Sequence, residues 1–235
     1  MVSENDEEKR SAADTVFEIK DCALIAIGTG ESAATLKELF HVVSDITSAS
    51  IYHHFWGGLL LPRFEEREFN NDFASWAKRK LDDDKLAEQL ALISPTDYAD
   101  LEELRQELID VIVERMNEGT CLPWLPASSA LEFLRSQIVV FDTHIRVTKP
   151  KELAEIINDL SPSTIFYHFI DARRRVSDGK DDFRAWLSNW EECSGLCNRL
   201  ADIDPYFDTL HNLRSQIAEV FAEFFQGGRN HGQSS

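Results

Sequence analysis

Two sets of polar and aromatic residues have the types and spacing that general acid–base chemistry needs. Each set has a histidine on an apolar helical segment, an aspartate that begins the next helix, and a tryptophan one turn beyond. The six residues are His54, Asp72, Trp76, His168, Asp182 and Trp186. Because imidazole titrates near neutral pH, a His–Asp pair beside an aromatic ring could transfer protons or hold a ligand. The same groups could instead join two helices through a buried His–Asp hydrogen bond, and the sequence leaves both interpretations open.

Metal binding is a second possible use of these groups. His54 and Asp72 with a third ligand could hold an ion, whereas the neighbouring His53 points about 100° away on a helix and cannot share it. Cys193 and Cys197 are spaced to share a helical face with a nearby histidine, although buried free thiols are the commoner fate of such cysteines. We therefore assign no metal site and expect no cofactor.

Three consecutive arginines, Arg173, Arg174 and Arg175, form a basic spot in an acidic chain. A guanidinium group binds phosphate or carboxylate oxygens through paired N–H donors, so this run is a candidate anion-binding site. Arginines in such a run also pair with carboxylates of their own chain. The sequence contains no phosphate-binding loop, catalytic serine elbow or Cys-x-x-Cys pair, and Gly28-Thr29-Gly30 predicts only a turn.

The composition narrows the class of partner. The chain has 235 residues, of which 42 are acidic and 24 basic, giving a formal net charge of −18. Nucleic-acid binding depends on clustered Lys and Arg, so we expect no nucleic-acid partner. No apolar run reaches the roughly 20 residues of a membrane helix, and the polar start does not resemble a signal peptide. The four cysteines are too few and too scattered for a disulfide framework, so we expect a cytoplasmic protein. We also expect that it binds no membrane.

Sequence patterns recur between the two halves of the chain. Lys37-Glu38-Leu39 returns as Lys151-Glu152-Leu153, and the apolar His-containing segment 51–55 returns as 165–169. We interpret this as a tandem duplication. The expected organisation is an acidic disordered tail at 1–16, a first helical repeat at 17–118, a Pro/Trp linker at 119–130, a second helical repeat at 131–226 and a disordered tail at 227–235.

Most of each half has helical periodicity, which predicts a mainly α fold. We expect about five helices in each repeat, with the two repeats forming an intramolecular pseudo-dimer. Thr35 and Glu38 have capping-box spacing, and Asp72 and Asp182 are suitable N-caps. Long helices are expected over 100–117 and 208–226.

Two further features concern the segments that connect these helices. The segments 17–27 and 131–147 alternate polar and apolar residues in places, so each is a strand or an opening helix, and we favour helix. The linker contains Trp124 and Leu125 between two prolines, which predicts that it packs against the helical repeats.

The first half of the chain resembles an uncharacterised prokaryotic family known only as a domain of unknown function. The residues that carry the resemblance are Gly30-Glu31-Ser32-Ala33, Leu36 to Phe40, Ser50-Ile51, His54, Asp72-Phe73, Trp76 and Leu86-Ala87. The second half matches more loosely. The family pattern has Arg-Gly before the Asp-Phe pair, where this chain has Asn70 and Asn71. The resemblance implies a shared architecture and no particular chemistry.

We expect a non-catalytic binding or interaction module, built from a duplicated helical domain, that binds another protein or a small molecule. The absence of the usual catalytic motifs favours this hypothesis. The alternative is an enzyme, or a metal- or small-ligand-binding protein, that uses the His-Asp-Trp set in one or both repeats.

Overall fold

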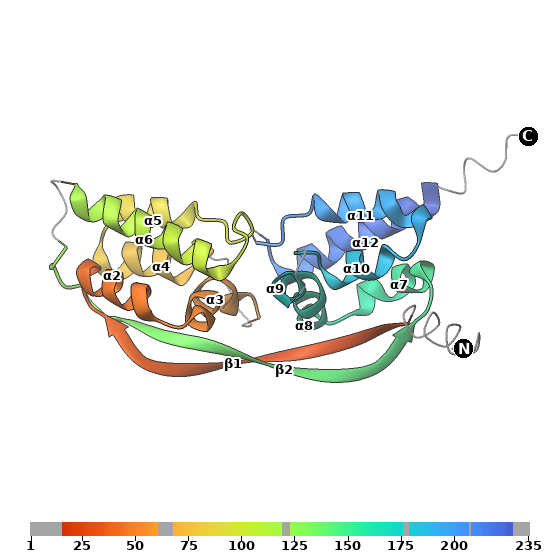
Figure 1. The fold of residues 1–235 in the computed structure, drawn as a ribbon, viewed down its shortest axis with the longest axis horizontal. Helices are drawn as coiled ribbons and strands as arrows, with labels where there is room; N and C mark the ends of the chain where they lie inside the picture. The colour runs from red at the N-terminus through yellow and green to blue at the C-terminus, as the bar shows by residue number, and fades with distance from the viewer. Residues whose placement is uncertain (1–15, 61–67, 119–122, 176–178, 207, 228–235) are drawn as a thin grey trace, which may run out of the picture. The chain divides into compact units, whose positions relative to one another are not determined.

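The computed structural model describes residues 16–60, 68–118, 123–175, 179–206 and 208–227. Two strands of equal length, β1 (Phe17–Ala33) and β2 (Leu131–Val147), each precede a group of helices. Figure 1 labels both strands and the helices that follow each of them along the chain. Residues 1–15 and 228–235, which include nearly all of both expected tails, lie outside the described ranges.

The strands β1 and β2 pair with each other in a two-stranded sheet. The Thr29 hydroxyl donates to the Phe133 carbonyl over 2.8 Å, and the Thr143 hydroxyl donates to the Ile19 carbonyl over 2.5 Å. Because the partner number falls as the strand number rises, the pairing is antiparallel. The turn expected at Gly28-Thr29-Gly30 is part of β1 instead, with Gly30 in the left-handed region at a φ of 86°.

The expected mainly α fold is therefore wrong, and the protein has a mixed α/β fold. The strand β2 is rich in β-branched and aromatic residues, which favour a pleated, half-buried backbone, and β1 contains fewer of them. Phe17 and Ile19 on β1, and Leu131 and Phe133 on β2, turn alternate side chains into the core. The sequence did not distinguish strand from helix here, because the alternation of polar and apolar residues in these segments is only partial. The strand that each segment pairs with also lies more than a hundred residues away.

Contacts divide the chain into two compact units, which we call the central unit (Leu24–Val139) and the terminal unit (Met1–Ala23 with Val140–Ser235). The boundaries fall inside β1 and β2, so each unit contains part of both strands. Two consecutive, self-contained helical bundles would not share strands in this way. The expected all-α tandem arrangement is wrong for this reason.

The helices of the central unit follow β1 and precede β2. They are α2 (Leu36–Asp45), α3 (Ser48–Trp56), the short turn η1 (Gly57–Leu59), α4 (Asp72–Trp76), the π-helical turn η2 (Ala77–Leu81), α5 (Asp84–Ala91) and α6 (Leu101–Asn117). Thr35 caps α2 as expected by accepting the Glu38 N–H, but the predicted capping box does not close, because the Glu38 carboxylate accepts the N–H of Ala34, one residue before the cap. Asp100 caps α6 by accepting two backbone N–H groups.

The terminal unit has a second group of helices after β2. They are α7 (Pro150–Ile156), η3 (Ile157–Asp159), α8 (Pro162–Ile165), the π-helical η4 (Phe166–Asp171), α9 (Ala172–Arg175), α10 (Asp182–Leu187), η5 (Glu191–Cys193), α11 (Ser194–Ala201) and α12 (Leu210–Gly227). The segments α8, η4 and α9 follow one another without a break. This continuous helical stretch carries His168 and the three arginines.

Each unit has its own apolar core. Fully buried side chains of the central unit include Leu36, Leu39, Ile51, Phe55, Phe73 and Phe133, and those of the terminal unit include Ile19, Phe166, Phe169, Phe183 and Phe221. Burial of such side chains is the main favourable contribution to folding. Among the helices within the described ranges, none is long and apolar enough to cross a bilayer.

Candidate functional site

Both ring nitrogens of His54 are hydrogen-bonded within the central unit. Nδ1 lies 3.0 Å from Oδ2 of Asp72, and the backbone N–H of Leu134 on β2 donates to Nε2 over 3.2 Å. The His54 residue is only 3% exposed. The imidazole therefore connects α3 to the start of α4 on one side and to the strand on the other.

These partners determine the protonation state of the His54 ring. A backbone N–H can only donate, so Nε2 must accept and carries no proton. Nδ1 then holds the ring proton and donates it to Asp72. Protonation of Nε2 would place two donors against each other at Leu134. The lone pair that a general base would use is already occupied by the strand.

His168 has the corresponding arrangement within the terminal unit. Its Nδ1 lies 2.8 Å from Oδ2 of Asp182, and the backbone N–H of Lys20 on β1 donates to its Nε2 over 2.9 Å. Arg175 also donates to the same Asp182 oxygen over 3.0 Å. The His168 ring is thus a neutral Nδ1–H tautomer that joins η4, α10 and β1.

The expected N-caps lie one residue too late in the sequence. The side chains that cap α4 and α10 belong to Asn71 and Asp181, which accept the N–H groups of Ala74 and Arg184. Since these residues take the capping role, the Asp72 and Asp182 carboxylates are available to the two histidines. Asn71, one of the two departures from the family pattern, also donates to the Leu90 carbonyl.

Trp76 and Trp186 are core residues in this structure. Trp76 is 4% exposed and its indole N–H donates to the Ser129 carbonyl over 2.9 Å. Trp186 is also buried, and its ring packs against those of Phe17 and Trp190 at centroid distances of 5.2 and 4.6 Å. The two indoles fill space beside the His–Asp pairs and do not form the wall of an open site.

His53 lies beside His54 but has different partners. Its Nδ1 is 2.8 Å from the Ser136 hydroxyl on β2, and burial lowers its pKa below the usual 6.5. Gly57 lies against the same ring, since a Cβ atom at Gly57 would be 2.7 Å from Nδ1. The Ser50 hydroxyl donates to the Leu134 carbonyl over 2.7 Å. Three polar side chains of α3 thus attach this helix to β2.

Two of the three candidate anion-binding arginines are engaged by a buried carboxylate. Asp171 is 1% exposed and accepts from Nε of Arg174 over 2.6 Å and from Nε of Arg175 over 2.9 Å. Arg175 also lies 4.0 Å from the centre of the Tyr167 ring. These two guanidinium groups neutralise Asp171 and Asp182.

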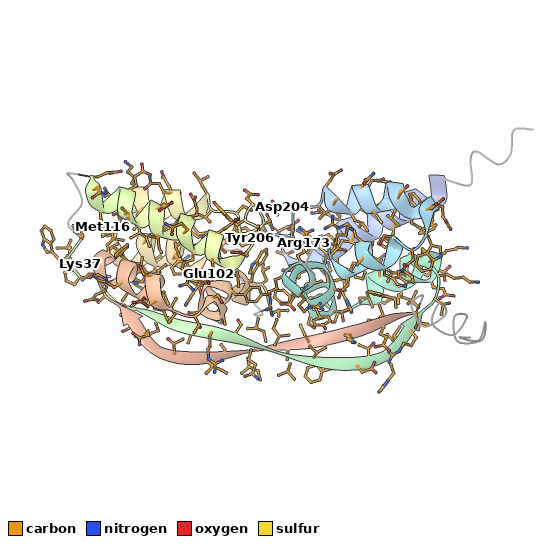
Figure 2. The ribbon with its side chains drawn as sticks, viewed as in Figure 1. Lys37, Glu102, Met116, Arg173, Asp204 and Tyr206 are labelled. Carbon is orange, nitrogen blue, oxygen red and sulfur yellow. The ribbon has the colours of Figure 1, made fainter. Side chains whose placement is uncertain are left out.

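Arg173 differs from its two neighbours. No carboxylate of the described residues lies within 4.0 Å of its guanidinium nitrogens. It contacts the Phe169 ring at 4.9 Å and makes one long hydrogen bond of 3.5 Å to the Ile203 carbonyl. Burial lowers the Arg173 pKa below its usual value. Figure 2 labels Arg173 and Asp204 in this unit.

The three described cysteines are poor candidates for reactive thiols, and Cys121 lies outside the described residues. Cys22 and Cys193 are buried, and burial raises their pKa values to about 12 and about 11. Burial also raises the pKa of Cys197. A thiol that stays protonated is a weak nucleophile and a weak metal ligand. Within the described part of the chain, no group of three His, Cys, Asp or Glu side chains is placed to hold a metal ion.

Sequence analysis missed an exposed apolar pair on the loop of residues 123–130. The Trp124 and Leu125 residues are 68% and 51% exposed, so the expectation that they pack against the helices is wrong. The loop itself is held in place. Pro123 accepts the Lys37 N–H over 3.0 Å, and Ala127 donates to the Ala34 carbonyl over 2.7 Å.

The two other contacts of this loop lie closer to β2. Ser128 donates to the Lys80 carbonyl over 2.7 Å, and the Ser129 carbonyl is the acceptor for Trp76. The loop is therefore anchored at four points along its length. A Trp-Leu pair between two prolines was the available signal, because prolines keep such a segment extended and away from a helix.

The chain is a mixed α/β protein, and within each unit a buried histidine attaches a helix to a strand. The chain belongs to a family described as "Family of unknown function (DUF5752)", whose model matches residues 14–222. That match covers a single domain and gives no support for two tandem copies. The internal repeat inferred from the sequence is therefore not retained, whereas membership of a family of unknown function is confirmed.

One solved structure shows the same fold. OrfY from Thermoproteus tenax superposes with a TM-score of 0.79 at 24% sequence identity, covering 90% of this chain and 96% of that chain. At this identity the similarity extends to the fold alone. A search of curated proteins finds no match.

Proposed function

We propose that the protein is a non-catalytic binding protein that docks another protein through the loop of residues 123–130. The observation that carries the proposal is the 68% exposed Trp124 side chain on a loop held by four hydrogen bonds. Tryptophan contributes a large share of the energy at many protein interfaces when it enters a partner's pocket. A pre-ordered loop lowers the entropy cost of that step.

The histidine geometry supports the non-catalytic part of the proposal. Proton transfer needs an imidazole with a free lone pair or a transferable proton near a substrate. In His54 and His168 one nitrogen is bonded to a strand N–H and the other to an aspartate. Both rings are buried, so a substrate would have to displace the strand to reach them.

The charge around the loop indicates the kind of partner. Lys37 and Lys80, whose backbones bond to the loop, are exposed and lack an acidic partner within 4.0 Å among the described residues. Lys78 and Lys85, by contrast, pair with Asp84 and Glu118. We infer a partner protein with an apolar pocket for Trp124 that is bordered by acidic side chains.

The test compares partners captured by the full chain and by variants. Proteins retained from a lysate of the source organism by wild type and lost with Trp124→Ser are identified, purified and titrated. The proposal predicts a dissociation constant at least tenfold weaker for Trp124→Ser. Leu92→Ser is the matched control, because Leu92 is 81% exposed on the same unit but takes no part in the four hydrogen bonds of the loop.

The charge inference is tested with the same purified partner. The double variant Lys37→Glu with Lys80→Glu should bind the partner more weakly than wild type. This loss of affinity should be larger at low salt than at high salt, because salt screens exposed charges. Equal weakening by Leu92→Ser and Trp124→Ser, or no partner whose affinity depends on Trp124, would contradict the proposal.

A further inference from the structure

The guanidinium group of Arg173 is partly buried and lacks a full set of hydrogen-bond acceptors among the described residues. Within those residues, its buried Nε atom has no hydrogen-bond acceptor, and its Nη2 reaches only the Ile203 carbonyl at 3.5 Å. A hydrogen bond of that length is at the limit of the geometry that stabilises a protein. Taking a guanidinium out of water without a full set of acceptors costs free energy.

The neighbouring carboxylates do not complete this environment. Asp181 is close enough to interact with Arg173 electrostatically, but it accepts both Nε–H and the backbone N–H of Arg184. Asp204, the other acidic neighbour, accepts the Tyr206 backbone N–H. Neither forms an ion pair with Arg173, and the positive charge of Arg184 offsets part of their attraction.

The Arg173 residue is partly exposed to solvent. It is half-buried as a whole, and among the described residues Nη1 has no hydrogen-bond partner. The Phe169 ring supports the guanidinium at 4.9 Å. An arginine placed on an aromatic ring with one open edge of N–H donors is suited to an oxyanion.

We propose that Arg173 is the binding residue for a small anionic ligand, whose phosphate or carboxylate oxygens accept hydrogen bonds from Nη1 and Nη2. Arg174 and Arg175 hold the helix in place through Asp171 and do not contact the ligand. The bound anion supplies the hydrogen-bond acceptors that the guanidinium lacks among the described residues. The site is independent of the Trp124 loop, so either proposal can fail without the other.

The experiment measures thermal unfolding of the full chain during titration with sodium phosphate, and separately with sodium succinate, at constant ionic strength set with sodium chloride. We expect a saturable increase in midpoint for wild type with at least one of the two anions. Arg173→Lys, which keeps the charge but loses the planar fork, should raise the apparent dissociation constant at least tenfold. Arg79→Lys, at a largely exposed arginine of the other unit, should leave the titration unchanged.

Two further measurements keep the proposal falsifiable. Without added anion, Arg173→Met should unfold at the same temperature as wild type or higher, because an unpaired buried charge has been removed. In the wild type, the Arg173 Nη–H NMR signals should shift with the same saturation curve as the unfolding midpoint. Effects that do not saturate, or that persist unchanged in Arg173→Lys, would overturn the proposal. A clear loss of stability in anion-free Arg173→Met would do the same.

Discussion

The backbone N–H of Lys20 donates to Nε2 of His168 over 2.9 Å, although 148 positions separate the two residues. A two-stranded sheet leaves one edge of each strand without a strand partner, and such edges promote aggregation. Here a histidine from a helix occupies one of these edge groups on β1. His54 does the same for Leu134 on β2, and Ser50 satisfies the carbonyl of that residue.

Removing either imidazole should weaken the attachment of a helix to its strand. Because Gln cannot reach both partners of the ring, His54→Gln and His168→Gln should each lower the free energy of unfolding by about 1–3 kcal/mol. Chemical denaturation with urea measures the change. His41→Gln is the control, since His41 is exposed, and it should shift the free energy by less than about 0.5 kcal/mol. Equal effects at all three positions would exclude a special role for the buried pairs.

Stability should fall as the pH is lowered below about 6.5. Burial lowers the His53 pKa in the folded state, so below pH 6.5 the unfolded chain binds a proton that the folded chain refuses. The free energy of unfolding then decreases as the pH falls from 6.5 towards the folded pKa, with a slope of at most about 1.4 kcal/mol per pH unit from this group. His53→Asn, which keeps a hydrogen-bonding side chain near Ser136, should have a flatter profile. An unchanged slope would assign the effect to other groups.

Gly57→Ala should be destabilising although its backbone is helical. The added Cβ would lie 2.7 Å from Nδ1 and 2.9 Å from Cε1 of His53, whose ring is confined by its contact with Ser136. Displacing a packed ring should cost about 1–3 kcal/mol in urea unfolding. Gly28→Ala is the matched control, because no atom lies within 4 Å of its added Cβ. If both variants unfold alike, the close packing of Gly57 on His53 does not exist in solution.

Two residues within the strands have a left-handed backbone conformation, and substitutions at them should change stability in opposite directions. Gly30 has a φ of 86° and His144 a φ of 61°. Gly30→Ala should lose about 1 kcal/mol, since a Cβ is strained in this region even where space is free. His144→Gly should gain up to about 1 kcal/mol for the same reason. Differential scanning calorimetry distinguishes these signs, and a stabilising Gly30→Ala would rule out the assigned backbone conformation.

Local signals predicted the local features of this fold well. The expected cap at Thr35 identified the start of α2, because caps act over three or four residues. The structure places His54 beside Asp72 and His168 beside Asp182, a pairing that the sequence offered as one possibility. The recurring motifs were real as sequence patterns, but the all-α repeats inferred from them did not foresee the strands β1 and β2.

Features that depend on distant parts of the chain could not be predicted in this way. The two strands needed each other as partners, and nothing in either segment indicates a partner so far along the chain. The bonds from Leu134 and Lys20 to the histidines were missed for the same reason, and they change the interpretation of the rings. The division of roles among the three arginines depends on buried Asp171, which their sequence spacing does not reveal.

The state of the two imidazoles is the central claim, and nitrogen-15 NMR of the histidine side chains tests it most directly. At pH 7.5 the account predicts that His54 and His168 are both neutral Nδ1–H tautomers, with slow hydrogen exchange at the Leu134 and Lys20 amides. Rings that exchange between tautomers, or that carry their proton on Nε2, would contradict it. Such a result would leave a free lone pair beside Asp72 or Asp182 and would favour proton-transfer chemistry at those sites.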